Sequence, residues 1–226
     1  EEDFKMKENL LQKWCDQAWL HCIYLIGIIM GNILLIKWPV WEVPQRLICL
    51  LAIMVPLHVF EENTAPGGFF YMNNLGQKSD APLVYPQNRL TNMFTNLGAE
   101  FIFILMTAFA VRIEAASVIA VVIFGIGELI HHTMDGIHMY KRYKDKGKKT
   151  LYGPGTITSY ICLLPLSVYG CLWLSENPFT ASQAILGVAI VLFIIIFLIL
   201  IPFAFSKRIK SQKYAFSSAG YFSKYE

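Results

Sequence analysis

Residues 185–205 read ILGVAIVLFIIIFLILIPFAF, a run of 21 residues without a charged side chain. About 20 consecutive apolar residues form a helix long enough to cross the hydrocarbon core of a bilayer. The rest of the chain has the same character, since 55% of its 226 residues are hydrophobic and 15% are charged. A typical soluble domain carries about 25% charged residues. The sequence therefore predicts an integral membrane protein.

Five further apolar stretches precede this one. The six predicted spans are residues 18–36, 46–62, 96–111, 115–140, 156–174 and 184–205. Residues 63–95 hold several prolines and glycines, so we expect an irregular and partly re-entrant connection there. The first 16 residues are charged and amphipathic, which does not fit a cleavable signal peptide. We expect a single all-α domain over residues 1–226, a polytopic membrane bundle of about six transmembrane helices.

Lysine and arginine are concentrated in two segments, residues 141–149 and the tail 206–226. The turn between the last two spans, residues 175–178, contains neither. Because cytoplasmic loops carry an excess of lysine and arginine, both basic segments are predicted to be cytoplasmic. Six spans then place the N-terminus inside as well, with residues 1–16 as a cytoplasmic amphipathic segment. Topology alone accounts for the basic residues, and we prefer this to a role in binding lipid head groups.

Spans two, three and four contain ionisable residues that are costly in a membrane and for that reason indicate a functional site. The predicted ligands are His58, Glu61, Glu62, Glu100, Glu128, His131 and His132. Asn96, Asp135 and His138 are predicted to lie around them as possible second-layer partners. The orientation derived from the basic segments brings all three groups to a similar depth, near the cytoplasmic face. We therefore expect them to converge.

The chemistry of the group favours a metal. Glu61, Glu62, Glu100 and Glu128 would carry four negative charges, and no lysine or arginine lies at their depth in these spans. Such groups must stay protonated, pair with histidinium, or bind a cation. Carboxylate and imidazole one turn apart on several helices is how bundle proteins hold a metal pair, and two divalent ions would balance the charge. A proton or ion pathway and a purely structural hydrogen-bond network are the alternatives.

The stretch His58-Val-Phe-Glu61-Glu62, followed by Pro66-Gly67-Gly68-Phe69, resembles the HXXEE family of bacterial membrane proteins. Tyr152-Gly-Pro154-Gly155-Thr-Ile-Thr158 is similar to a turn of that family, which usually has Asn where this chain has Gly153. The resemblance covers most of residues 45–175 and implies the membrane fold and the motif. It implies no activity, because the family is largely uncharacterised. A looser similarity, to membrane hydroxylases and desaturases, lacks their repeated HxxHH boxes.

The sequence thus predicts a membrane-embedded metalloenzyme with a dinuclear Glu/His site of iron or zinc. Its substrate would be a membrane lipid or another hydrophobic small molecule, with Glu61 and Glu128 as the candidate catalytic residues. We place a di-iron oxidase, hydroxylase or desaturase first, which would need an electron-donor protein. A zinc-dependent hydrolase is the alternative enzyme. A transporter, an immunity protein or an accessory subunit is the non-enzymatic alternative. Nucleic acid is not an expected partner, and the expected location is the bacterial plasma membrane, with the metal site toward the cytoplasm.

Overall fold

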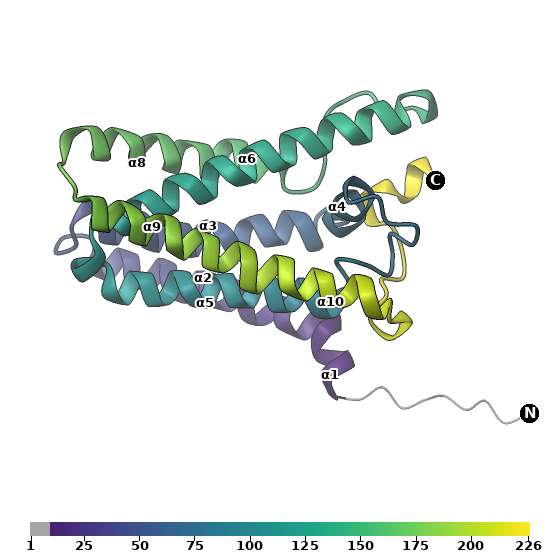
Figure 1. The fold of residues 1–226 in the computed structure, drawn as a ribbon, viewed down its shortest axis with the longest axis horizontal. Coiled ribbons are helices and arrows are strands. Elements are labelled where there is room, and N and C mark those ends of the chain that lie inside the picture. The colour runs from purple at the N-terminus through teal and green to yellow at the C-terminus, as the bar shows by residue number, and fades with distance from the viewer. Residues whose placement is uncertain (1–9) are drawn as a thin grey trace, which may run out of the picture.

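The computed structural model describes residues 10–226, and within that range the chain is helical and contains no strand. Six helices are long and apolar enough to cross a membrane: Leu10–Lys37, Val43–Asn63, Arg89–Ile113, Ala115–Lys146, Thr156–Glu176 and Ala181–Ile209. They run side by side along the long axis of the molecule (Figure 1). The predicted all-α bundle of six spans is confirmed.

The six spans are built from shorter helical elements, some of which are π-helical. In chain order they are α1 (Leu10–Lys13), η1 (Trp14–Ala18), α2 (Trp19–Lys37), α3 (Val43–Asn63), α4 (Phe69–Gly76), α5 (Arg89–Ile113), α6 (Ala115–Tyr143), η2 (Lys144–Lys146), α7 (Thr156–Thr158), η3 (Ser159–Leu163), α8 (Leu164–Glu176), α9 (Ala181–Phe193), η4 (Ile194–Leu200), α10 (Ile201–Ile209), η5 (Gln212–Tyr214) and η6 (Gly220–Tyr225).

The bundle has a hydrophobic core but, unlike a soluble protein, it also exposes many large aliphatic side chains and buries several ionisable ones. Leu35 and Ile185 are 77% and 69% exposed, whereas Glu100 and His132 are fully buried. Burying charged and polar groups while exposing large aliphatic ones is favourable only where the surroundings are apolar. The outer surface of the bundle is therefore suited to contact with lipid chains.

The first and third membrane-crossing helices start several residues earlier in the chain than the sequence predicts. The first membrane-crossing helix starts at Leu10, so part of the predicted segment 1–16 belongs to it, and residues 1–9 lie outside the described chain. The third starts at Arg89 because Asn88 caps it: Asn88 Oδ1 accepts from the backbone N–H groups of Leu90 and Thr91, both at 3.0 Å. A side chain that satisfies these free N–H groups fixes where a helix begins.

The connection between the second and third spans is more regular than expected. It contains the helix α4, whose residues Phe69 to Met72 are buried against Met139 and Tyr143 of α6 and Phe222 of η6. Phe70 also stacks on Phe216, with ring centroids 3.5 Å apart. The chain after α10 therefore folds back over α4 and covers the end of the bundle at which both described chain ends lie (Figure 1).

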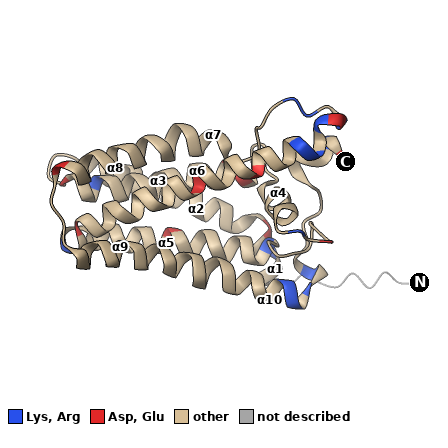
Figure 2. Cartoon of the chain, turned by 45° about the horizontal axis from the view of Figure 1, so that its top comes forward, with Lys and Arg blue, Asp and Glu red and all other residues tan. Residues whose placement is uncertain are grey.

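Charged side chains are separated along the bundle. Lysine and arginine gather mainly at the two ends, whereas acidic residues also occur within α5 and α6 (Figure 2). The ends of α6 and α10, which carry the basic segments, lie at the same end of the bundle as α4 (Figure 2). The positive-inside rule assigns that end to the cytoplasm, and the orientation N-in/C-in stays a prediction from the charge pattern.

Candidate metal centre

The last turns of α3 present one imidazole and one carboxylate to the interior. His58 and Glu62 are four residues apart, so they lie on the same face of the helix. Both are buried, and His58 Nε2 lies 3.4 Å from Glu62 Oε1. Pro56 lies just before them, where a Cβ on Gly27 of α2 would come within 2.9 Å of the proline ring. The glycine thus lets α2 pack closely against α3 at this level.

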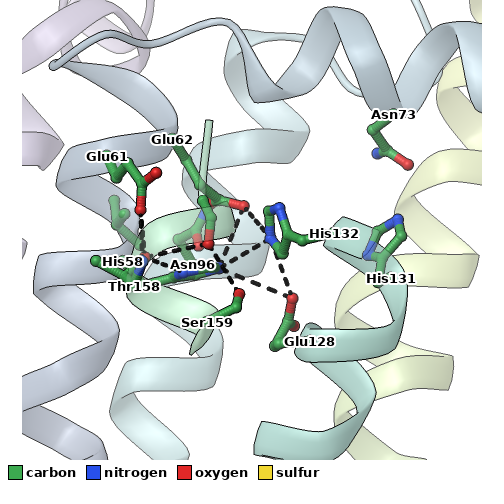
Figure 3. Close-up of polar contacts among 12 residues, drawn as sticks. His58, Glu61, Glu62, Asn73, Asn96, Glu128, His131, His132, Thr158 and Ser159 are labelled. Carbon is green, nitrogen blue, oxygen red and sulfur yellow. Dashed lines mark hydrogen bonds and ion pairs between the residues drawn. The ribbon is translucent and has the colours of Figure 1, made fainter. Parts of the chain in front are cut away.

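A matching pair faces them from α6. Glu128 and His132 are also four residues apart, with Glu128 Oε2 3.6 Å from His132 Nε2. The two pairs meet across the helix interface, where His132 Nε2 lies 3.1 Å from His58 Nε2 and 3.3 Å from Glu62 Oε1. His58 Nε2 is 3.8 Å from Glu128 Oε2. Four side chains from two helices therefore point at one another (Figure 3).

These separations have the size that a metal ion requires. Ligands placed tetrahedrally at 2.0–2.1 Å from an ion are about 3.3 Å from one another. The five separations above run from 3.1 to 3.8 Å. His58, Glu128 and His132 each offer an atom within 4.8 Å of the other two. Two imidazoles and two carboxylates form a donor set that suits iron or zinc, and the charge of one divalent ion would balance the two carboxylates.

A series of two hydrogen bonds, through Thr158 to Glu61, fixes the orientation of the His58 ring. His58 Nδ1 lies 2.8 Å from Thr158 Oγ1, and that hydroxyl donates to Glu61 Oε2 at 2.6 Å. Because the hydroxyl proton is directed to the carboxylate, the oxygen accepts the proton of Nδ1–H. Nε2 then carries its lone pair toward Glu62 and Glu128. Imidazole metal ligands usually donate their second N–H in this way, which sets the tautomer.

Glu61 therefore faces away from the cluster and toward the start of the fifth span. Its carboxylate accepts from the backbone N–H groups of Ile157, at 3.1 Å, and Thr158, at 2.8 Å. Free N–H groups and the helix dipole at this end favour a negative charge. Burial, and then the neighbouring carboxylate of Glu61, raise the pKa of the Tyr152 hydroxyl.

His132 is held by packing. The turn before the fifth span passes directly over its ring, and Gly155 has a φ of +93°, a conformation that other residues adopt only with strain. A Cβ on Gly155 would overlap the His132 imidazole. The ring centroid of Phe69 is 4.8 Å from that of His132. His132 Nδ1 is buried and has no hydrogen-bond partner in the described residues, so shape rather than a second hydrogen bond fixes this ring.

The remaining residues predicted from the sequence lie around this group or apart from it. His131 faces the other way from His132, with Nε2 3.3 Å from Asp135 Oδ2 and its side chain 44% exposed. Asn96 donates to the backbone oxygen of Asn92 at 2.9 Å. Glu100 is completely buried in α5, and neither carboxylate oxygen has a hydrogen-bond partner among residues 10–226. Their roles as ligands or neighbours of ligands stay predictions.

A cavity of about 320 Å³ adjoins the centre. His58, Glu62 and Glu128 form part of its wall, and His131, Asp135, His138 and Asn96 also line it. Ligand-binding cavities usually measure about 300–1,000 Å³, so this one is large enough for a small molecule or part of a lipid. The predicted residues on three helices thus share one cavity, with the exception of Glu61, Glu100 and His132, which do not line it.

Thr158 contacts the centre, but the sequence does not predict it as a site residue. The signal available was its position, at the end of the Tyr152–Thr158 turn that resembles a pattern of the HXXEE family. A threonine at the start of a span looks like a helix-capping residue, because threonine is common in that position. Only the packing of α7 against α3 reveals that its hydroxyl lies between His58 and Glu61.

The centre and the motif coincide with a known family. Residues 49–170 match the family described as "Protein of unknown function with HXXEE motif". This match spans more than half of the chain, and the chain belongs to that family. No curated protein and no solved structure matches the chain. In this chain the motif is His58-Val-Phe-Glu61-Glu62, and its three named positions are the imidazole and the two carboxylates described above.

Proposed function

We propose that this protein is a membrane-embedded metalloenzyme that binds a divalent ion through His58, Glu62, Glu128 and His132. The single observation that supports this most is that five of the six separations between the four donor atoms are 3.1 to 3.8 Å, close to the spacing of ligands around one ion. The cluster accounts for one ion. A second ion, as the sequence predicts, would need further ligands from residues such as His131, Asp135 or Glu100.

The reaction class that we place first is oxidation of a hydrophobic substrate. The cavity wall one turn deeper than the centre consists of Val55, Ala99, Phe124 and Ile194. An alkyl chain lying against this wall would place its C–H bonds near an ion bound at the centre. Iron can take up to six ligands, so an ion held by these four side chains would still have open positions, as in the non-haem iron oxygenases that bind iron through two imidazoles and a carboxylate. Insertion of one oxygen atom of dioxygen into a C–H bond, with the other leaving as water, consumes two electrons and two protons. An electron-donor protein would have to supply the electrons.

Hydrolysis by zinc is the second candidate, and the position of Glu62 favours it. His58, Glu128 and His132 alone would supply the His₂Glu set common to catalytic zinc sites. Glu62, 3.3 to 3.4 Å from both histidine nitrogens, would then be free to act as a general base on a water molecule. Under this alternative Glu62 takes the catalytic role that the sequence suggests for Glu61, since Glu61 is engaged by Thr158 and the backbone.

Metal content tests the proposal. Protein purified in detergent without chelators should contain close to one tightly held ion per chain, measured by inductively coupled plasma mass spectrometry. Iron would support the oxidase and zinc the hydrolase. His132→Asn should abolish the bound ion, and His131→Asn, a change at the adjacent residue, should leave it in place. Native protein with no bound ion after growth and purification in iron and zinc would refute the proposal and favour a transporter, immunity protein or accessory subunit.

A further inference from the structure

The cavity next to the centre has an apolar end and a polar end. Its deep end is formed by Val55, Ala99, Phe124 and Ile194. Its other end, toward α4, is formed by Asn73, Gln77, Gln87, Asp135 and His138. Along α6 the lining runs from Phe124 to His138, about 21 Å at 1.5 Å per residue. A molecule that fills it must therefore be apolar at one end and polar at the other.

The amides at the polar end are largely satisfied by one another. Asn73 Nδ2 donates to Gln87 Oε1 at 2.6 Å, and Gln87 Nε2 donates to Asn92 Oδ1 at 2.8 Å. Asp135 differs from them, because its residue is only 6% exposed and its Oδ2 has no hydrogen-bond partner in residues 10–226. His131 Nε2 lies 3.3 Å from this oxygen, within ion-pair distance but not in hydrogen-bond geometry. A buried carboxylate oxygen without a donor is costly, so a donor from the bound molecule would be favourable here.

The charges around the cavity restrict that molecule further. Among the described residues that line it are three carboxylates, Glu62, Glu128 and Asp135, and no lysine or arginine. A phosphate or carboxylate head group at the polar end would lie next to the Asp135 carboxylate, with only the imidazoles of His131 and His138 as possible cationic partners, at a cost in free energy. An ammonium group would lose its hydration and would compete with His131 for Asp135. An uncharged group that donates a hydrogen bond avoids both costs.

The cavity is also open toward the lipid side of the bundle. α9 lies against α6 near one end of the molecule, whereas α10 and the second half of α6 separate toward the end where α4 lies (Figure 1). The cavity is lined from both sides of this separation, by His131 and Asp135 of α6 and by Ile199 and Phe203 of η4 and α10. The half-exposed His131 shows that this side is not closed.

We propose that the cavity takes an amphiphile with an apolar chain and an uncharged, hydrogen-bond-donating polar group, such as a long-chain alcohol or amide. It enters from the membrane between α6 and η4, and Asp135 Oδ2 accepts the hydrogen bond from its polar group. This inference rests on the proposed function, since it names the substrate class of the same centre.

A photoreactive dodecyl alcohol with a diazirine in its chain tests this on the full-length protein in phosphatidylcholine nanodiscs. Mass spectrometry should locate saturable labelling on α6 and η4, suppressed by excess 1-dodecanol and much less by dodecanoate. Labelling that 1-dodecanol does not suppress, or that dodecanoate suppresses equally well, would overturn the proposal. Stronger suppression by dodecylamine than by 1-dodecanol would overturn the uncharged head group.

Three variants locate the site. Asp135→Asn keeps the shape but removes the charge that strengthens the hydrogen bond, so the alcohol should bind about fivefold more weakly. Ile199→Trp should block the entrance and abolish saturable labelling. Ile195→Trp is the matched control, since Ile195 is in the same η4, is exposed and does not line the cavity. Equal labelling of the two tryptophan variants would contradict the proposed entrance even if Asp135→Asn failed to fold.

Metal content measured on the same samples separates this inference from the proposed function. Protein that holds an ion but shows no saturable labelling would refute the substrate class and leave the metalloenzyme proposal standing. Protein that is labelled saturably but holds no ion would refute the metalloenzyme proposal. The cavity would then be a binding site for uncharged amphiphiles in a protein that is not a metalloenzyme.

Discussion

Glu61 and Glu62 are adjacent in the last turn of α3 and are buried to the same extent, at 6% and 4% exposed. Glu62 faces α6 and lies within 3.4 Å of two histidine nitrogens. Glu61 faces α7 and accepts three hydrogen bonds from backbone and hydroxyl donors. Within one motif, hydrogen-bond partners rather than burial therefore decide whether a carboxylate is available for chemistry. Glu61 already has its donors, whereas Glu62 has nitrogens that can share an ion with it.

The largest effect is expected from Glu62→Gln. This change removes a negatively charged ligand and keeps the shape of the side chain. Loss of a residue that only orients a ligand typically costs 10–100-fold in metal affinity, so loss of a ligand should cost more than about 100-fold. Competition titration with a chromogenic chelator would measure the affinity. Unchanged affinity would remove Glu62 from the ligand set and weaken the distinction between the two glutamates.

Chelation should destabilise the native protein and not the Glu62→Gln variant. An ion that binds only the folded state stabilises it by about 2.7 kcal/mol when its free concentration is 100 times Kd. Stripping the ion should therefore lower Tm in a thermal-shift assay, and Glu61→Gln should retain most of this decrease. If metal-free native protein, verified by elemental analysis, melts at the same temperature as untreated protein, the structural hydrogen-bond network becomes the better interpretation.

Thr158→Val should weaken metal binding by about 10–100-fold, the range usual for partners that orient a ligand. Valine keeps the branched shape and removes the hydroxyl between His58 and Glu61. Thr158→Ser restores the hydroxyl and should recover most of the affinity. A serine variant as weak as the valine variant would show that packing of the methyl group, rather than the hydrogen bond, supports His58.

Glu61→Gln should act mainly on stability. Each hydrogen bond to a charged group contributes about 1.5–3 kcal/mol, and the amide can still accept through its oxygen. We therefore expect a decrease of about 1–2 kcal/mol in the free energy of unfolding, with a smaller loss of metal affinity than in Glu62→Gln. Chemical denaturation in detergent micelles would measure it. A loss of metal as large as that of Glu62→Gln would mean that both carboxylates bind the ion.

The smallest effect is expected from Glu100→Gln. The carboxylate of Glu100 is buried without a hydrogen-bond partner in the described chain and makes none of the ion pairs of the centre. An amide of the same shape carries no charge to bury, so stability should be unchanged or slightly higher. Elemental analysis should find the native metal content. A large loss of metal would support the sequence-based prediction that Glu100 is a ligand.

The sequence was sufficient for the six spans, and it singled out α3 and α6, which carry the four donors, but also α5, which carries none of them, and not the start of the fifth span, which supplies Thr158. Uninterrupted apolar runs predict the spans, and the cost of placing ionisable groups in a membrane indicates which helices are functional. It could not separate Glu61 from Glu62, or His131 from His132. Adjacent residues on a helix point about 100° apart, as the 3.6-residue turn requires, so one of each pair must face elsewhere. Which one does so depends on how α3, α6 and α7 pack.

The sequence also did not reveal α4. Residues Phe69–Gly76 form a helix of only eight residues between prolines and glycines, too short to be stable alone. Its apolar face is covered by residues from the end of α6 and from the tail, more than 60 positions away in the chain. Contacts between distant segments leave no local periodicity in the sequence, so the sequence predicts an irregular connection here and not a helix.

The passage of Gly155 over the His132 ring also has a consequence for biogenesis. Helices α3 and α6 bring the four donor atoms together, but Thr158 and Gly155 come from the start of the fifth span, which is synthesised later. A nascent chain that ends before residue 155 would have all four donors, but neither the hydroxyl that orients His58 nor the turn that confines His132. If the centre binds an ion as proposed, high-affinity loading would be a late event, because it would have to wait until the fifth span has been inserted and has docked. Cellular factors that deliver the ion would meet an almost complete protein rather than an emerging one.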